Sequence, residues 1–526
     1  MPLDTEESLE SQLAHICAKV IGTYQKYDVI HPEVTDVDTY TTGGSGYVIR
    51  RKGRYYVVTN AHVTEFSVKI HVTFPATGNH KFHMREIGHS EQADTAVLEF
   101  VDEASFIERI GPEEYLLEFY PSLHVPVSSD IIVCGYGRLD MMAITHGRIL
   151  GYGVNDYDNI IGIHAPFVSA TNRRAMDILH LGGNSGSPVL YRDRSTLRII
   201  GTLNSGIPGS SKSFLMISEQ VAPFVDFVID NPREGQKTQW ITPNLGVIIY
   251  PLGETTSRAL YSRPTGTEVS YVYPYCDLAK GDFIYGVRVD RVPASSGKSS
   301  GSRVARRLLR GGGAEGTYFD IDAYGMVHVP WAIESIPVDW LPGVYPYGTR
   351  LIFDLVRDGR EMQVTMESQP KPWRPPYYRT SPLPVSIVRG LVATYFCLNQ
   401  VNAYTMFVPT LLHPRLRKHN QVIISGSAAT GPDQTSVFLQ LPSIVSHCIR
   451  DSQRVEVRKL RDLEGASAII TDCGIFFLDS VSQDASGSDA ETGGSAHHKE
   501  GRNETSHSTS AKPRRRRRNS HSNRGR

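Results

Sequence analysis

The chain has 526 residues, with 55 Lys and Arg against 55 Asp and Glu and a formal net charge of zero at pH 7. This length exceeds one hydrophobic core, so two to four domains are expected, and the even charge balance excludes a global field that would favour nucleic acid, membranes or acidic partners. The six cysteines include no Cys-x-x-Cys pair, which argues against a disulfide framework or a structural zinc site.

The N-terminal half of the chain is predicted to be built mainly from short strands. Residues 8–22 begin with a helical pattern and then turn extended. Strands rich in Val, Ile and Tyr, separated by Gly, Asn, Asp and Pro, are expected at 44–51, 54–63, 67–74, 95–101, 130–137, 187–193 and 197–206. A closing helix is expected at 217–229. So many short strands over about two hundred residues favour a β-barrel or sandwich.

Composition shifts divide the rest of the chain. A hairpin is predicted near 348–366, where a strand, the turn Arg357-Asp358-Gly359 and a returning strand follow one another. A flexible basic insertion is expected at 294–316. The expected divisions are 1–30 (N-terminal segment), 31–230, 231–243 (linker), 244–368, 369–385 (Pro-rich linker), 386–480 and 481–526. The last segment has few apolar residues, so it is predicted to be disordered.

Ser185, in the glycine-rich stretch LGGNSGS, is a candidate nucleophile. A catalytic serine needs an imidazole to take its proton, a carboxylate to orient that imidazole, and N–H donors for the oxyanion. His62 follows an apolar strand and Asp94 precedes another, in an order known for this chemistry. Each residue alone would be an ordinary surface or turn residue, but the three together predict a triad. Gly183 can adopt the backbone torsions that aim an N–H at the oxyanion.

The segments GGSGYVI, VTNAHV, DTAVLEF, THGRILGYG, MDILHLGGNSGSPVL and IIGTLNSG resemble the successive signatures of HtrA/Deg (DegP-like) proteases, closest to the plant-type Deg subgroup. These are serine endopeptidases of the chymotrypsin fold, and the resemblance covers most of 40–230. It implies His62 as general base, Asp94 as its orienting partner and Ser185 as nucleophile. It also implies an oxyanion hole at Gly183, Asn184 and Ser185, with the N–H groups of Gly183 and Ser185 as donors.

The substrate pocket of this fold is lined by residues a few places before the nucleophile, here Ile178, Leu179 and His180. Asn204 is assigned to the same pocket. No acidic residue is positioned to bind a basic side chain, since Asp177 lies further back. A preference for small or aliphatic side chains is therefore expected. The alternative is that Ile178 and Leu179 belong to the barrel core.

The unit at 244–368 resembles a PDZ domain through NLGVII, YCDLAKGDFIYGV and the closing hairpin. Such a domain adds an extended peptide to a sheet edge, and Leu245, Gly246 and Val247 are the candidate peptide-binding residues. A β-rich domain with an ordinary Gly turn is the alternative. The unit at 386–480 resembles a divergent second PDZ-like domain, for which a packing or assembly role is expected. The expected fold is thus mainly β: a chymotrypsin-like double β-barrel protease domain, two PDZ-like α+β domains and a disordered basic tail.

The expected function is ATP-independent cleavage of unfolded or exposed protein segments, in protein quality control or regulated proteolysis, with protein or peptide substrates. No metal or cofactor is expected, and the resemblance implies a trimer-based homo-oligomer. With no apolar run of about eighteen residues and a polar, acidic start that does not read as a signal peptide, the protein is expected to be intracellular, cytoplasmic and/or nuclear, without membrane contact.

Five consecutive arginines, Arg514 to Arg518, lie in the tail. The stretch 512–526 is a candidate contact for an import receptor or for nonspecific nucleic acid, or is only a solubilising end. Two other functions stay open: a catalytically resting scaffold or chaperone with PDZ peptide binding, and a nucleic-acid-associated regulator that uses the Arg-rich tail.

Overall fold

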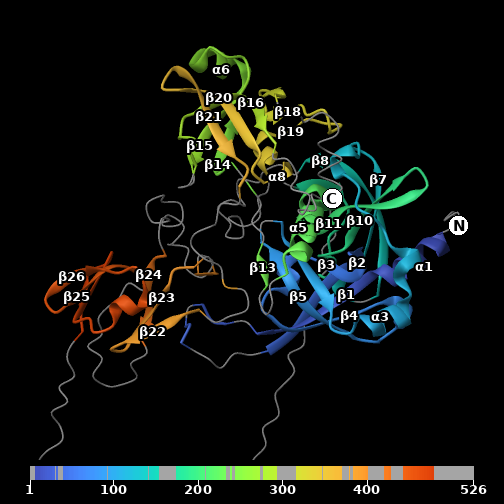
Figure 1. Ribbon diagram of the computed structural model, residues 1–526, viewed down its shortest axis with the longest axis horizontal. Coiled ribbons are helices and arrows are strands. Elements are labelled where there is room, and N and C mark those ends of the chain that lie inside the picture. Colours follow the sequence, from blue (N-terminus) through green and yellow to red (C-terminus); the bar gives the residue numbers. More distant parts are fainter. Residues whose placement is uncertain are drawn as a thin grey trace, which may run out of the picture. The chain divides into compact units, whose positions relative to one another are not determined.

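Strands dominate the computed structural model of the chain (Figure 1). The residues it describes are 6–25, 27–29, 31–33, 39–91, 93–139, 141–152, 173–207, 209–232, 237–239, 243, 245–272, 276–292, 316–345, 347–369, 378, 383–397, 399–400, 420–427 and 442–478. The tail at 481–526 and the basic insertion at 294–316, apart from Gly316, lie outside the described residues.

The first barrel begins with the predicted change from helix to strand, which is confirmed. Helix α1 (Glu6–Ile16) passes directly into β1 (Cys17–Gln25). The other strands are β2 (Thr39–Arg51), β3 (Arg54–Thr59), β4 (Ser67–Thr73), β5 (Phe82–Ser90) and β6 (Thr95–Phe100). They pair in the order β5-β4-β1-β2-β3-β6, and a β5–β6 pairing closes the ring. The short strand β13 (Thr238–Gln239) adds to β5 in parallel.

The second barrel is closed as well. Its strands are β7 (Asp130–Gly135), β8 (Ala143–Tyr152), β9 (Arg173–Asp177), β10 (Pro188–Asp193), β11 (Thr196–Gly206) and β12 (Lys212–Ile217), in the order β10-β11-β12-β9-β8-β7. The expected closing helix is α5 (Ser218–Asp230). Two closed six-stranded barrels confirm the predicted double-barrel architecture.

Short helices connect these strands. They are α2 (Ala61–Thr64), α3 (Glu103–Ile110), η1 (Pro75–Thr77), η2 (Pro112–Tyr115), η3 (Ser122–His124) and η4 (Gly137–Leu139). One of them, α2, differs from the prediction of a continuous strand: the strand expected at 54–63 ends at Thr59, and His62 lies on α2. His62 is thereby on a helical turn that follows the strand.

The unit that follows contains β14 (Val247–Pro251), α6 (Glu254–Tyr261), β15 (Thr267–Val272), β16 (Phe283–Arg291), β17 (Tyr318–Asp320), β18 (Met326–Val327), β19 (Ile336–Pro337), η6 (Val338–Trp340), α8 (Leu341–Val344), β20 (Arg350–Arg357) and β21 (Arg360–Glu367). The main sheet runs β14-β15-β16-β20-β21. The predicted hairpin is confirmed: at its turn, φ is 50° at Asp358 and 73° at Gly359, as a two-residue turn of the hairpin type requires.

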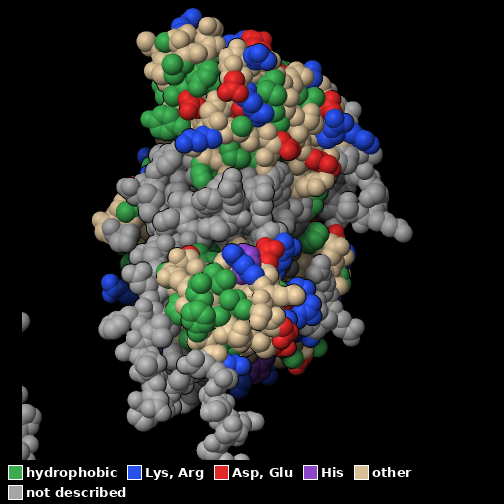
Figure 2. All heavy atoms as spheres, turned by 90° about the vertical axis from the view of Figure 1, so that its left-hand side faces the viewer, with side chains coloured by type: hydrophobic (Ala, Val, Ile, Leu, Met, Phe, Trp, Pro, Cys, Tyr) green, Lys and Arg blue, Asp and Glu red, His purple; other side chains and the backbone are tan. Residues whose placement is uncertain are grey.

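The third sheet contains β22 (Val385–Val388), β23 (Leu391–Tyr395), β24 (Val422–Ser427), β25 (Ser443–Arg450), β26 (Gln453–Glu456), β27 (Ala468–Thr471) and β28 (Ile475–Phe477), with η9 (Leu460–Leu463) between β26 and β27. Its order is β22-β23-β24-β25-β27-β28, with β26 on β25. Hydrophobic side chains gather on one face of this unit (Figure 2), and Ile387, Ile475 and Phe477 are exposed. Together with the preceding sheet it fits the expected strand-rich PDZ-like part of the fold.

Candidate active site

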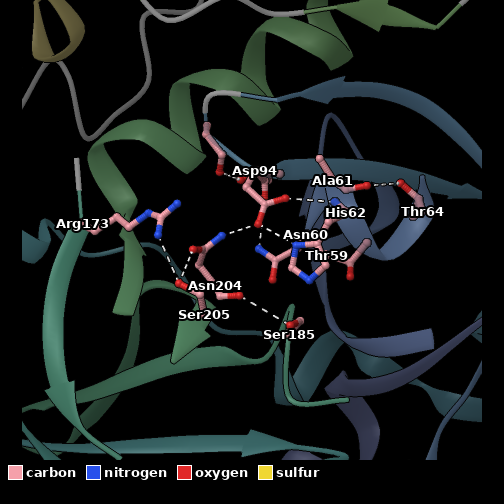
Figure 3. A network of polar contacts seen from close by, with 12 residues as sticks. Thr59, Asn60, Ala61, His62, Thr64, Asp94, Arg173, Ser185, Asn204 and Ser205 are labelled. Carbon is pink, nitrogen blue, oxygen red and sulfur yellow. Dashed lines mark hydrogen bonds and ion pairs between the residues drawn. The ribbon is translucent and has the colours of Figure 1, made fainter. Parts of the chain in front are cut away.

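His62 and Asp94 are brought together by the pairing of β3 and β6. Thr59 at the end of β3 is opposite Ala96 near the start of β6, so the residues that flank these ends meet. Asp94 Oδ2 lies 2.7 Å from His62 Nδ1, and its Oδ1 accepts the backbone N–H of His62 at 2.9 Å (Figure 3). This double contact orients the imidazole and leaves Nε2 as its proton-accepting nitrogen.

Two asparagines complete the surroundings of Asp94, which is only 5% exposed. Asn204 donates its side-chain amide to Asp94 Oδ2, and Asn60 donates to the Asp94 carbonyl at 2.8 Å. A buried carboxylate is destabilising unless hydrogen bonds replace its water. Asn204 and the two contacts of His62 supply these bonds to the carboxylate, whereas Asn60 holds the backbone of Asp94. Asn204, expected in the substrate pocket, therefore has its side chain on the carboxylate that orients His62.

Ser185 lies in the loop between β9 and β10 of the second barrel and is 8% exposed. In the described part of the chain, its hydroxyl has two hydrogen-bond partners: His180 Nε2 at 3.3 Å and the Asn204 carbonyl at 3.5 Å. Figure 3 shows Ser185 next to the group formed by His62, Asp94 and Asn204. The three residues expected as a triad thus come from both barrels and lie around one centre.

The Ser185 loop has the backbone geometry expected before a nucleophile. Gly183 has φ of 99°, a value that favours glycine. The Gly182 carbonyl accepts the Arg138 N–H, and because N–H and C=O of a trans peptide point in opposite directions, the Gly183 N–H points away from Arg138. The Asn184 N–H donates to the Leu181 carbonyl at 2.9 Å and is used within the loop. Gly183 and Ser185 are left as the candidate donors to an oxyanion.

Ser45 holds this loop from the first barrel, a role that sequence reasoning missed. Its N–H donates to the Ser185 carbonyl at 2.8 Å, and its hydroxyl donates to the Gly183 carbonyl at 2.7 Å. The same hydroxyl accepts the Tyr136 N–H at 2.9 Å. Gly186 is packed so closely that an added Cβ would lie 2.0 Å from the Ser45 carbonyl. A single serine of β2 therefore fixes the loop that carries the candidate nucleophile.

The residues expected in the pocket have different surroundings. Ile178 is 2% exposed and belongs to a buried hydrophobic cluster that includes residues of the second barrel, whereas Leu179 is 52% exposed. His180 is half-buried and touches the Ser185 hydroxyl. Burial, reinforced by the nearby His62, lowers the pKa of His180 below its usual value. The aliphatic preference expected from the sequence stays a prediction.

The candidate peptide-binding residues lie at the start of β14, an edge strand of its sheet. Leu245 is 1% exposed, Gly246 has φ of 72°, and Val247 begins the strand. The Leu245 carbonyl accepts the Cys276 thiol at 3.0 Å. Peptide binding at this edge stays a prediction.

The described residues hold neither a metal-binding cluster nor a membrane-spanning helix. Within them, no group of three or more His, Cys, Asp or Glu side chains could hold a metal ion. None of the helices that the structure describes is both long and apolar enough to cross a membrane.

Comparison with known proteins identifies the double barrel. Residues 44–201 match the family model described as a trypsin-like peptidase domain. No curated protein matches the chain.

Several solved structures are similar to this chain. The HtrA-type protease AlgW with a decapeptide has 17% identity and a TM-score of 0.42, covering 68% of this chain and 97% of that one. A serine endoprotease from Yersinia pestis has 15% identity and a TM-score of 0.36, covering 68% and 96%. The active form of the Rv3671c protease from M. tuberculosis has 17% identity and a TM-score of 0.32, covering 45% and 89%. Since these TM-scores are all below 0.5, the assignment rests on the match over 44–201.

Proposed function

We propose that this chain, a serine endopeptidase with a trypsin-like peptidase domain, cleaves unfolded or exposed protein segments through His62, Asp94 and Ser185. The observation that carries the proposal is the double contact of Asp94 with the backbone N–H and the imidazole Nδ1 of His62. A carboxylate held in this way fixes the imidazole tautomer that can accept a serine proton.

The reaction would proceed by acyl transfer. The Ser185 hydroxyl turns to His62, gives its proton to Nε2 and attacks the substrate carbonyl carbon. The oxyanion of the tetrahedral intermediate accepts hydrogen bonds from the N–H groups of Gly183 and Ser185. The C–N bond then breaks, and the leaving amine takes the proton from His62. His62 then takes a proton from a water molecule, whose oxygen attacks the acyl carbon. As the ester C–O bond breaks, His62 returns the proton to Ser185 Oγ and the acid product leaves.

The HtrA/Deg-like organisation supports a role in protein quality control or regulated proteolysis. The AlgW structure, which holds a decapeptide, is of an HtrA-type protease. By the same resemblance, the protein would act independently of ATP as a trimer-based homo-oligomer. Its first PDZ-like unit would bind peptide termini, and the second would serve packing or assembly. We expect it to act inside the cell, as the sequence predicts. Strand-rich units behind the barrels are consistent with this organisation.

The test is cleavage of unfolded β-casein by the full chain and by Ser185→Ala, followed by mass spectrometry. We expect fragments with the unchanged protein only, and labelling of Ser185 by a fluorophosphonate probe. Ser446→Ala, which removes an exposed hydroxyl of β25, serves as the matched control and should cleave normally. Equal cleavage by Ser185→Ala, or an unlabelled and inactive protein, would contradict the proposal and favour a scaffold.

A further inference from the structure

His180 touches the candidate nucleophile but has no part in the proton transfers proposed above. We infer that His180 selects the scissile residue, favouring a side chain that ends in an amide or carboxylate oxygen, as in Gln or Glu. This inference rests on the proposed function, because it specifies which peptide bonds Ser185 attacks.

The position of His180 is fixed by its packing as well as by its hydrogen bond. Nε2 lies 3.3 Å from Ser185 Oγ. On the other side, the residue lies against Gly206 of β11, where an added Cβ would come within 2.3 Å of the His180 Cβ. Gly206 thus provides the space that the histidine occupies. The imidazole is thus held beside the hydroxyl of the candidate nucleophile.

The two apolar residues next to His180 in sequence differ in their surroundings. Ile178 packs with the buried core and would meet an added Cβ at Gly147 of β8 at 2.2 Å through its Cγ1. Leu179 is 52% exposed. Among the four residues expected in the pocket, the hydrogen bonds to Ser185 in the described part of the chain come from the His180 imidazole and the Asn204 carbonyl.

A polar substrate side chain would replace the serine as the partner of His180. Burial, with the added effect of His62, lowers the pKa of His180, which favours the neutral ring with one N–H donor and one acceptor nitrogen. When Ser185 turns to His62 to react, His180 Nε2 loses its partner. An amide or carboxylate oxygen can accept from the ring in its place, whereas an aliphatic side chain would leave a half-buried polar nitrogen without a hydrogen bond.

The experiment uses a β-casein cut site mapped with the full chain, made as quenched fluorescent peptides that differ only in the scissile residue: Gln, Glu, Leu or Ala. We expect kcat/KM for Gln or Glu to exceed that for Leu by at least about tenfold. His180→Leu should abolish or reverse this preference, and His180→Gln should keep part of it. His83→Leu makes the same change at an exposed position of β5 and should leave the preference unchanged. Thermal unfolding of each variant checks its folding.

The outcomes separate this inference from the function that it rests on. A preference for Gln over Glu would point to the neutral ring as donor, and Glu over Gln to a protonated ring; both support the selection. A preference for Leu that is the same in the unchanged protein and in His180→Leu would overturn the inference alone. No cleavage of any peptide, with Ser185 unlabelled by fluorophosphonate, would overturn the proposed function and the inference with it.

Discussion

The side-chain amide of Asn204 binds the same oxygen of Asp94 that contacts the imidazole of His62. The carboxylate is therefore held from both barrels, by His62 on one side and by a residue of β11 on the other. The amide nitrogen of Asn204 can only donate a hydrogen bond. It therefore fixes the position of the carboxylate, which remains the acceptor for the His62 imidazole.

Asn204→Ala should lower kcat roughly ten- to a hundredfold, since it removes a hydrogen bond to a buried charged group. KM should change little, because the Asn204 carbonyl next to Ser185 is kept. Peptide kinetics measure both constants. Asn231→Ala removes an exposed amide that donates to the Phe227 carbonyl and should retain full activity. A changed preference for the scissile residue with an unchanged kcat would instead place Asn204 in the pocket, as expected from the sequence.

Gly183→Ala should lower kcat by about a hundredfold or more, the effect of losing one oxyanion donor. A residue with a Cβ is strained at a φ of 99°. We therefore expect the backbone to move and the N–H of residue 183 to turn away from the oxyanion. Gly53→Ala is the matched control: Gly53 has φ of 81° in an exposed turn and no atom within 4 Å of an added Cβ. It should lose some stability and no activity. Similar activity of both variants would show that the Gly183 N–H does not serve the reaction.

The third prediction concerns Asp339 and stability. Burial raises the pKa of this carboxyl from 3.8 to about 7, and its Oδ1 has no hydrogen-bond partner in the described part of the chain. Between these two pH values the folded state keeps a proton that the unfolded state releases. Folding therefore takes up a proton, and stability falls as the pH rises from about 4 to about 7 and then levels off.

Asp339→Asn should remove this dependence. We expect its unfolding temperature to exceed that of the unchanged protein by at least about 5 °C at pH 8 and to match it near pH 4.5. Tryptophan fluorescence can follow the transition, since Trp331 and Trp340 lie in the same unit and are buried. The same difference at both pH values would show that the ionisation of Asp339 has no role.

The sequence predicted the parts of the site that depend on local pattern. Strand periodicity located the ends at which His62 and Asp94 lie, and the glycines around Ser185 indicated its tight turn; the positive φ at Gly183 agrees with this. Strand β5 was missed because its outward positions carry Arg and His, although its burial alternates as a half-buried strand does.

The position of Asn204 could not be read from the sequence. The pairing of β11 with β12 shifts register between Leu203 and Ser205, which is a bulge at Asn204. A bulge turns a side chain away from the direction that simple alternation predicts, and here it directs Asn204 to Asp94. Ser45 was missed for a related reason, because its contacts with Gly183 and Ser185 span about 140 residues and exist only when the barrels meet.

The hydrogen bonds from Ser45 to the Ser185 loop have a consequence for biosynthesis. All six strands of the first barrel, together with His62 and Asp94, precede Ser185 in the chain and are therefore synthesised before it. Until the second barrel closes and its loop reaches the Ser45 hydroxyl, the emerging polypeptide lacks an ordered nucleophile. Because Ser45 and Ser185 belong to different barrels, an ordered nucleophile requires the chain to be made through the second barrel.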